Sequence, residues 1–250
     1  MTTLRAALGF FTRLPVGSAP SSDVRGIMRW FPVVGLIVGT LTGLLTGLAA
    51  LILPPPLSGV LGCLAWVFLT GGLHLDGVAD CGDGLPVEAP PARRLEIMKD
   101  SRLGTFGGAA LFFVLAVKAA ALGTLTASLA PFAAGWKAFF PLAGMCCMAA
   151  TLGRSLTVLA MRLPAARPDG LGARARDGMT FWDEAMALAL GLAVCLVNGA
   201  RGLTALAAAL LAAWLILSAA RKRLGGVTGD VFGCLTESVE CAALTACCLM

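Results

Sequence analysis

Seven apolar segments, each close to the length of a bilayer crossing, constrain the fold of this chain more than any other feature. They lie at about residues 32–53, 57–75, 105–130, 138–161, 184–198, 203–220 and 231–250. A transmembrane helix needs about 20 consecutive, mainly apolar residues, whereas a soluble domain is about 45–50% apolar and about 25% charged. Here hydrophobic residues make up 58% of the chain and charged residues 13%, and the mean hydropathy is +0.87. The sequence therefore predicts an all-α, polytopic integral membrane protein.

The number of crossings follows from the same segments. The fifth segment is short and the seventh carries two acidic residues, so the pattern predicts about six or seven transmembrane helices. We expect residues 1–250 to form a single membrane-embedded domain.

The basic residues fall in alternate connections between these segments. They precede the first segment and follow the second, fourth and sixth (Arg5, Arg13, Arg25, Arg29; Arg93, Arg94, Lys99, Arg102; Arg162, Arg167, Arg174, Arg176; Arg221, Lys222, Arg223). Because Lys and Arg concentrate in short cytoplasmic loops, we expect these connections to face the cytoplasm. The asymmetry and attraction to anionic lipid account for the net charge of +5. No basic stripe interleaved with aromatic residues indicates a nucleic-acid partner.

The acidic residues outside the segments all lie on the same side, and the densest stretch is residues 71–85, with His74, Asp76, Asp80 and Asp83. If the second helix continues through this stretch, the three aspartates at i, i+4 and i+7 project from one face. Stacked like charges repel unless a cation lies between them, and such oxygen ligands suit Mg²⁺, with Mn²⁺ as the alternative ion. The other interpretation is a solvated helix cap.

A second polar stretch, residues 93–108, leads into the third segment. Lys99, Ser101, Arg102 and the glycine-rich turn Gly104–Gly108 are candidates for holding phosphate oxygens, because a helix N-terminus presents free N–H groups and a favourable dipole. Asp100 is a candidate fourth metal ligand. An ordinary basic loop is the alternative.

Two further candidates lie in connections on the same side. Arg167 lies in a loop rich in proline and glycine and is suited to clamp a phosphate in bidentate geometry, although an ordinary topology-setting arginine explains it equally well. Asp230 ends another glycine-rich turn, which leads into the last segment, and is a candidate substrate contact.

Four charged residues lie well inside the predicted segments, away from the segment ends. A charge at the centre of a transmembrane helix costs about 2.5–3.5 kcal/mol on insertion scales and is a functional candidate by default. The opposite signs of Lys118 and Arg154, against Glu237 and Glu240, predict an intramembrane polar network in which they pair. A purely structural salt bridge is one explanation of this network. A polar chamber shared with the cytoplasmic face is the other.

Six motifs follow one another along the chain: Arg13-Leu-Pro, Trp30-Phe-Pro-Val-Val-Gly35, Gly72-Leu-His-Leu-Asp-Gly-Val-Ala-Asp80, Met98-Lys-Asp-Ser-Arg-Leu-Gly-Thr-Phe-Gly107, Ala166-Arg-Pro-Asp-Gly-Leu-Gly172 and Gly226-Val-Thr-Gly-Asp230. Taken in this order, they resemble the cobalamin synthase family, the adenosylcobinamide-GDP ribazoletransferases. Cys81-Gly82 departs from the small or polar pair expected there. The resemblance implies an inner-membrane enzyme that requires Mg²⁺ and joins adenosylcobinamide-GDP to α-ribazole, or to its 5'-phosphate, releasing GMP.

On that resemblance each candidate has a role in phosphoryl transfer, where metal and cationic side chains neutralise charge on the phosphoryl oxygens. The metal ligands would be Asp76, Asp80, Asp83 and Asp100; Lys99, Arg102 and Arg167 would stabilise the diphosphate; Ser101, Gly104 and Asp230 would contact substrate. His74 would position or deprotonate the attacking hydroxyl, or make a structural hydrogen bond.

Two other functions and several partners are compatible with the pattern. CDP-alcohol phosphotransferases also place aspartates with glycine and alanine at a helix end, but their pattern has Ala-Arg after the first Asp-Gly, where this chain has Val78-Ala79. A transporter is suggested by the charges inside the segments, but no inverted repeat relates the two halves. Membrane lipid, other cobalamin-assembly enzymes and a second copy of the chain are the expected partners besides the substrates.

Overall fold

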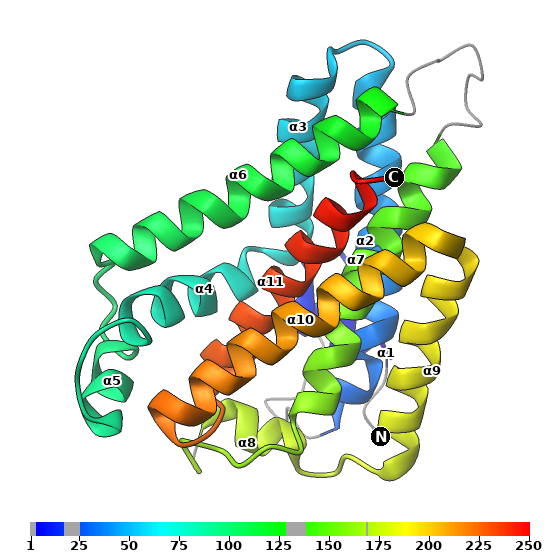
Figure 1. Ribbon diagram of the computed structural model, residues 1–250. Helices are drawn as coiled ribbons and strands as arrows, with labels where there is room; N and C mark the ends of the chain where they lie inside the picture. The colour runs from blue at the N-terminus through cyan, green and yellow to red at the C-terminus, as the bar shows by residue number, and fades with distance from the viewer. Residues whose placement is uncertain (1–3, 18–25, 129–138, 169) are drawn as a thin grey trace.

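The structure, a computed structural model, describes residues 4–17, 26–128, 139–168 and 170–250, and these residues form a helical bundle (Figure 1). Their elements are α1 (Leu4–Phe11), η1 (Ile27–Trp30), α2 (Phe31–Ala50), α3 (Pro55–Thr70), α4 (Leu73–Gly84), α5 (Pro91–Ile97), α6 (Thr105–Ser128), α7 (Phe139–Ala160), α8 (Leu171–Arg176), α9 (Phe181–Val197), α10 (Gly199–Leu224) and α11 (Gly229–Cys247). Within this part of the chain the one β feature is an isolated bridge between Ala165 and Val227. The all-α prediction is confirmed.

Each of the seven apolar segments contains a helix within the described residues, but fewer of these helices have the length and composition of a membrane span. Among the described residues, four helices qualify, Ile27–Ala50, α6, α7 and α10, and the bent pair α3 and α4 makes a fifth if it counts as one span. The expected number of six or seven is therefore not confirmed. Helix α9 is only 17 residues long, and it exposes large apolar side chains such as Leu188, Leu196 and Val197. Helix α11 contains three acidic residues and is buried along most of its length, so it resembles a helix packed inside a bundle more than one facing lipid.

Helices α2 and α7 pack closely because glycines repeat every four residues along α2. A Cβ atom added at Gly39 would lie 2.3 Å from the carbonyl oxygen of Cys146, and one at Gly43 would lie 2.5 Å from the Cα of Ala143. Small residues at this spacing let helix backbones approach in a membrane, where packing rather than the hydrophobic effect drives association. The two helices form the most extensive helix–helix contact in the described bundle.

The second apolar segment does not continue as one helix into the aspartate-rich stretch. It ends at Gly71 and Gly72, which have φ angles of +66° and +69°, a left-handed conformation that glycine adopts without steric cost. Helix α4 then departs from α3 at an angle of 99°. The expectation of a continuous helix was therefore wrong, although the three aspartates still share one short helix.

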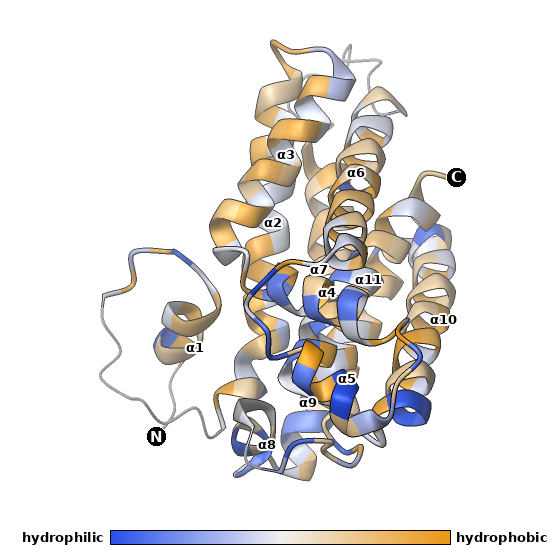
Figure 2. Ribbon diagram, turned by 90° about the vertical axis from the view of Figure 1, so that its left-hand side faces the viewer, coloured by the Kyte–Doolittle hydropathy of each residue, from blue (hydrophilic) through white to orange (hydrophobic). Residues whose placement is uncertain are grey.

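Polar residues gather at one end of the bundle, around α4, α5 and α8, which we call the polar end (Figure 2). Helix α11 runs through the interior from this end and packs against α4, α6, α7 and α10. The Arg94 side chain fixes α5 beneath α4, since its guanidinium donates to the carbonyl oxygens of Gly84, Leu85 and Ala89. The polar end thus brings short helices far apart in sequence against the start of α11.

Candidate active site

A cavity of about 370 Å³ opens at the polar end, within the size range of about 300–1,000 Å³ typical of small-molecule sites. Its walls come from α1, η1, the start of α2, α4, the end of α7, the loop after α7, α8 and the start of α11. Apolar and aromatic side chains line most of it. Its polar lining consists of His74, Asp76, Thr157, Arg167, Arg176, Thr228, Asp230 and Thr236.

Three residues singled out in the sequence meet at the mouth of this cavity: Asp76, Arg167 and Asp230. The Arg167 guanidinium donates to Asp230 Oδ2 at 2.8 Å and to the carbonyl oxygen of Leu95 at 2.7 Å. The position of Asp230 depends on a close helix contact, because a Cβ atom at Gly77 would lie 2.4 Å from the Asp230 carbonyl oxygen. The glycine after Asp76 therefore lets α4 touch the first turn of α11.

The carboxylate of Asp80 lies close enough to other carboxylates to feel their charge. Burial, and then the charges of Asp230, Asp76 and Asp83, raise the pKa of Asp80 to about 7, while Arg167 opposes the shift. A divalent cation would relieve this repulsion. In the described part of the chain, however, no group of three or more His, Cys, Asp or Glu side chains converges tightly enough to form a ready metal site. The donor chemistry fits a hard cation, and the side chains would have to close around it.

The other two predicted metal ligands have their carboxylates engaged elsewhere. Asp83 accepts hydrogen bonds from the backbone N–H groups of Gly104, at 2.7 Å, and Gly107, at 2.8 Å. It therefore satisfies amides at the start of α6 that the sequence suggested for phosphate. Asp100 pairs with Arg102 at 2.6 Å, and this pairing lowers the Asp100 pKa to about 2.

Three other sequence candidates lie together on an exposed surface. Lys99, Ser101 and Arg102 are exposed in the connection between α5 and α6, outside the described lining of the cavity. They belong to the polar end but not to its cavity.

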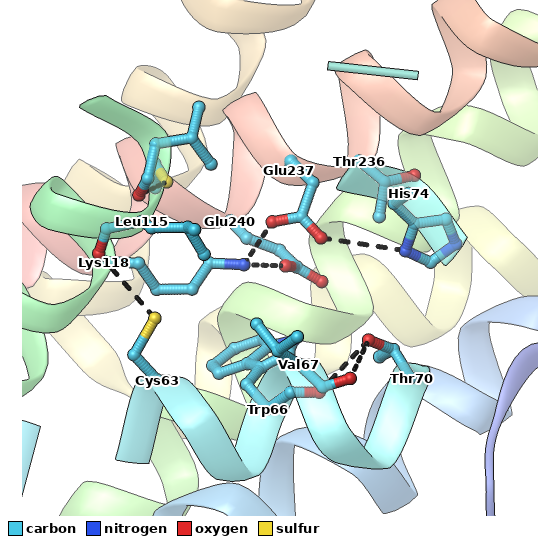
Figure 3. Close-up of polar contacts among 12 residues, drawn as sticks. Cys63, Trp66, Val67, Thr70, His74, Leu115, Lys118, Thr236, Glu237 and Glu240 are labelled. Atoms are coloured by element: carbon cyan, nitrogen blue, oxygen red, sulfur yellow. Dashed lines mark hydrogen bonds and ion pairs between the residues drawn. The ribbon is translucent and has the colours of Figure 1, made fainter. Parts of the chain in front are cut away.

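The four charges inside the predicted segments form the expected pairs in the bundle interior. Figure 3 shows Lys118 pointing toward Glu237 and Glu240. Lys118 Nζ lies 2.5 Å from Glu237 Oε2 and 2.7 Å from Glu240 Oε2, and Arg154 lies 2.6 Å from Glu240 Oε1. All four side chains are buried. His74 Nδ1 lies 3.9 Å from Glu237 Oε1, so the network reaches the inner wall of the cavity.

Sequence reasoning missed most of the cavity lining. Phe11, Phe31 and Phe232 face it from α1, α2 and α11, and each reads as an ordinary core residue in the sequence. The exposed Arg176 on α8 was interpreted only as a topology signal. The N-terminal aromatic pair, Phe10 and Phe11, was the one available hint, because two adjacent aromatics outside an apolar segment suggest a docked helix.

Comparison with known proteins supplies the family. The family model described as cobalamin-5-phosphate synthase matches residues 3–248. Three relatives are named adenosylcobinamide-GDP ribazoletransferase: those of Klebsiella pneumoniae strain 342 (38% identical, covering 96% of this chain and 97% of the relative), Synechococcus sp. (36%, 96% and 93%) and Brevibacillus brevis (32%, 98% and 96%). No solved structure matches at a significant level.

Proposed function

This chain belongs to the cobalamin-5-phosphate synthase family, and on that premise we propose that the cavity mouth is where it joins adenosylcobinamide-GDP to α-ribazole or its 5'-phosphate. A ribazole hydroxyl attacks the cobinamide-linked phosphorus, and the bond from that phosphorus to GMP breaks. The observation that carries this proposal is the meeting of Asp76, Arg167 and Asp230 at the mouth of an otherwise apolar cavity. The polar end would face the cytoplasm of a bacterial inner membrane, as its basic connections suggest.

Arg167 is the cation best placed to receive a phosphoryl group. Its guanidinium is already oriented by Asp230 and by the Leu95 carbonyl oxygen, so little conformational freedom is lost when it binds an anion. Charge-assisted hydrogen bonds from a guanidinium hold phosphate oxygens in a fixed geometry. In this proposal Arg167 holds the reacting phosphorus in line for attack.

Lys99, Ser101 and Arg102 form an exposed segment at the same end of the bundle. They are suited to the outer part of adenosylcobinamide-GDP, because a corrinoid is far larger than the cavity. Diphosphate oxygens would then lie between this segment and the mouth.

Asp76, Asp80 and Asp230 would hold a divalent cation, since both carboxylate oxygens of Asp83 accept from amides and both of Asp100 accept from Arg102. Arg167 and Thr228 donate to one oxygen of Asp230, Oδ2, which leaves Oδ1 to face a cation. When bound, Mg²⁺ would neutralise charge on the phosphoryl oxygens. The raised pKa of Asp80 supports this assignment, because these carboxylates repel one another without a cation. Asp83 would act by fixing the start of α6 beside α4.

The test is a conversion assay with purified protein, adenosylcobinamide-GDP and α-ribazole, with GMP release followed at several Mg²⁺ concentrations. We expect activity that requires Mg²⁺ and is lost in Asp76→Asn and Asp80→Asn. Asp177→Asn is the matched control, because Asp177 is an exposed carboxylate outside the cavity lining. Full activity of both site variants at low Mg²⁺ would refute the metal assignment.

The family match favours this reaction over the two alternatives. A CDP-alcohol phosphotransferase would act on CDP-diacylglycerol when it is supplied in place of adenosylcobinamide-GDP. A transporter would move substrate across the membrane of proteoliposomes without chemical conversion. Either result, in the absence of GMP release, would overturn the proposed function.

A further inference from the structure

We infer that the inner part of the cavity binds the aromatic base of the ribazole substrate, and that His74 recognises it through a hydrogen bond to its unsubstituted ring nitrogen. The inference rests on the proposed function and adds to it a binding subsite and a residue that determines specificity. The transfer chemistry stays at the mouth, and His74 acts as a recognition residue.

The inner cavity has the apolar and aromatic lining that a neutral aromatic ring requires. Buried side chains of Phe11, Ile27, Met28 and Phe31 line it. Phe11 and Phe31 have ring centroids 4.4 Å apart, and aromatic groups prefer offset or edge-to-face neighbours at about 4.5–7 Å. With a cavity volume of about 370 Å³, the pocket can hold a bicyclic base and its ribose but not a corrin ring.

Among the described residues, His74 is a buried polar group of the inner cavity with no hydrogen-bond partner for its side chain. It lines the cavity and is only 5% exposed, yet neither ring nitrogen has a hydrogen-bond partner among the described residues. A neutral imidazole has one N–H donor and one acceptor, and leaving such groups unsatisfied in the interior is costly. A bound group that accepts a hydrogen bond would relieve part of that cost.

The described neighbours of His74 make no hydrogen bond to it. Thr236 shares a hydrogen bond with Thr157 at 2.9 Å and donates to the Phe232 carbonyl oxygen at the same distance. Glu237 lies 3.9 Å from Nδ1, beyond hydrogen-bond range, and is held by Lys118. The Phe31 ring meets the imidazole edge-on, with centroids 5.5 Å apart, so His74 is held in place while its nitrogens stay available.

The two ends of the cavity match the two ends of a nucleoside. His74 and the buried aromatic residues form the inner end, whereas the exposed Asp76 and the half-buried Arg167 and Asp230 form the mouth. A base seated against His74 would direct its ribose toward the mouth, where the attacking hydroxyl must lie. An acyl chain of a lipid would fill the apolar walls equally well, but it offers nothing to the imidazole.

The experiment compares α-ribazole with an analogue in which a C–H group replaces the unsubstituted ring nitrogen. In the unaltered enzyme we expect the analogue to have a KM about tenfold higher, the value of one buried hydrogen bond. His74→Phe should raise the KM for α-ribazole by about the same factor and leave the analogue unchanged, so the discrimination disappears. His74→Gln, which keeps an N–H donor, should restore part of it. Trp214→Phe, at an exposed position on α10, is the control.

The possible outcomes separate this inference from the proposed function. Absence of GMP release in the unaltered enzyme would refute the function itself. If transfer occurs but the enzyme does not distinguish the two nucleosides, or if His74→Phe lowers kcat equally for both, His74 does not recognise the base. Equilibrium dialysis of α-ribazole without the second substrate should give about tenfold weaker binding to His74→Phe.

Ala173→Leu provides a second route if the His74 variants fold poorly. Ala173 lines the cavity, so a larger side chain should raise the KM for α-ribazole and leave the KM for adenosylcobinamide-GDP unchanged. An unchanged KM for α-ribazole, or displacement of bound α-ribazole by phospholipid, would overturn the inference.

Discussion

Removing one partner of the buried ion-pair network should destabilise the protein more than removing a balanced pair. The network holds two cations and two anions, so its formal charge is zero. Lys118→Met leaves one uncompensated negative charge, and Glu237→Gln leaves one positive charge; both side chains are at most 3% exposed. Breaking a buried pair typically costs about 3–5 kcal/mol, which corresponds to a fall in Tm of about 6–20 °C for a chain of this size.

The double variant Lys118→Met/Glu237→Gln restores neutrality and keeps the contact between Arg154 and Glu240, at 2.6 Å. Because replacing a whole buried pair by well-packed neutral groups is often nearly neutral in stability, its Tm should fall by less than that of either single variant. The assay is thermal unfolding in one detergent at one heating rate, since membrane proteins commonly unfold irreversibly. If the double variant loses the sum of the two single losses, the residues act independently and the reasoning fails.

Three other outcomes follow from the mouth of the cavity. Arg167→Lys should lower kcat/KM about tenfold or more, because a lysine cannot hold a phosphate while keeping both present contacts; equal kinetics of the two proteins would contradict this. Gly77→Ala should cost about 1–3 kcal/mol of stability by overpacking against the Asp230 backbone. Gly108→Ala is the control and should be tolerated, because its added Cβ meets only a side chain at 3.8 Å. The unfolding temperatures of the two variants and of the unaltered protein test this. Because the pKa of Asp80 is raised to about 7, this carboxyl is protonated in the folded state and ionised in the unfolded state between about pH 4 and 7. In EDTA, Tm should therefore fall as pH rises through this window, and the fall should be smaller in Asp80→Asn. An identical dependence of Tm on pH in both proteins would rule out the raised pKa of Asp80.

The pattern of charges predicted much of the site because charge is costly in an apolar chain. The opposite signs alone predicted that Lys118 and Arg154 pair with the two glutamates of α11. An unpaired charge inside a membrane-embedded bundle is costly, so each charge is expected to lie beside one of the opposite sign. The gathering of Asp76 and Arg167 at one end likewise followed from the alternation of basic connections. The apolar composition predicted the helical class for a different reason. A backbone in lipid must satisfy its own hydrogen bonds, and a helix does so within one segment.

Backbone geometry was harder to predict, and it decides which aspartates are available. The break at Gly71 and Gly72 depends on two left-handed residues, yet glycines are also common inside transmembrane helices. The role of Asp83 depends on a tertiary contact with amides of Gly104 and Gly107, more than 20 residues away. No periodicity encodes such a contact, so the sequence could not separate Asp83 from Asp76 or Asp80.

Helix α11 connects the interior network to the mouth of the cavity. Its first turn carries Asp230, which contacts Arg167, and two turns later it places Glu237 between Lys118 and His74. The helix is buried along most of its length, so a shift of its first turn must be transmitted to the glutamates or absorbed by strain. The ion pairs therefore fix the position of α11 along its own axis. They thereby also fix the distance between Asp230 and the aspartates of α4. An interior salt-bridge network in this fold is thus as much a part of site geometry as of stability, and its neutral double variant should keep a folded protein while changing the Mg²⁺ concentration at which transfer is half-maximal.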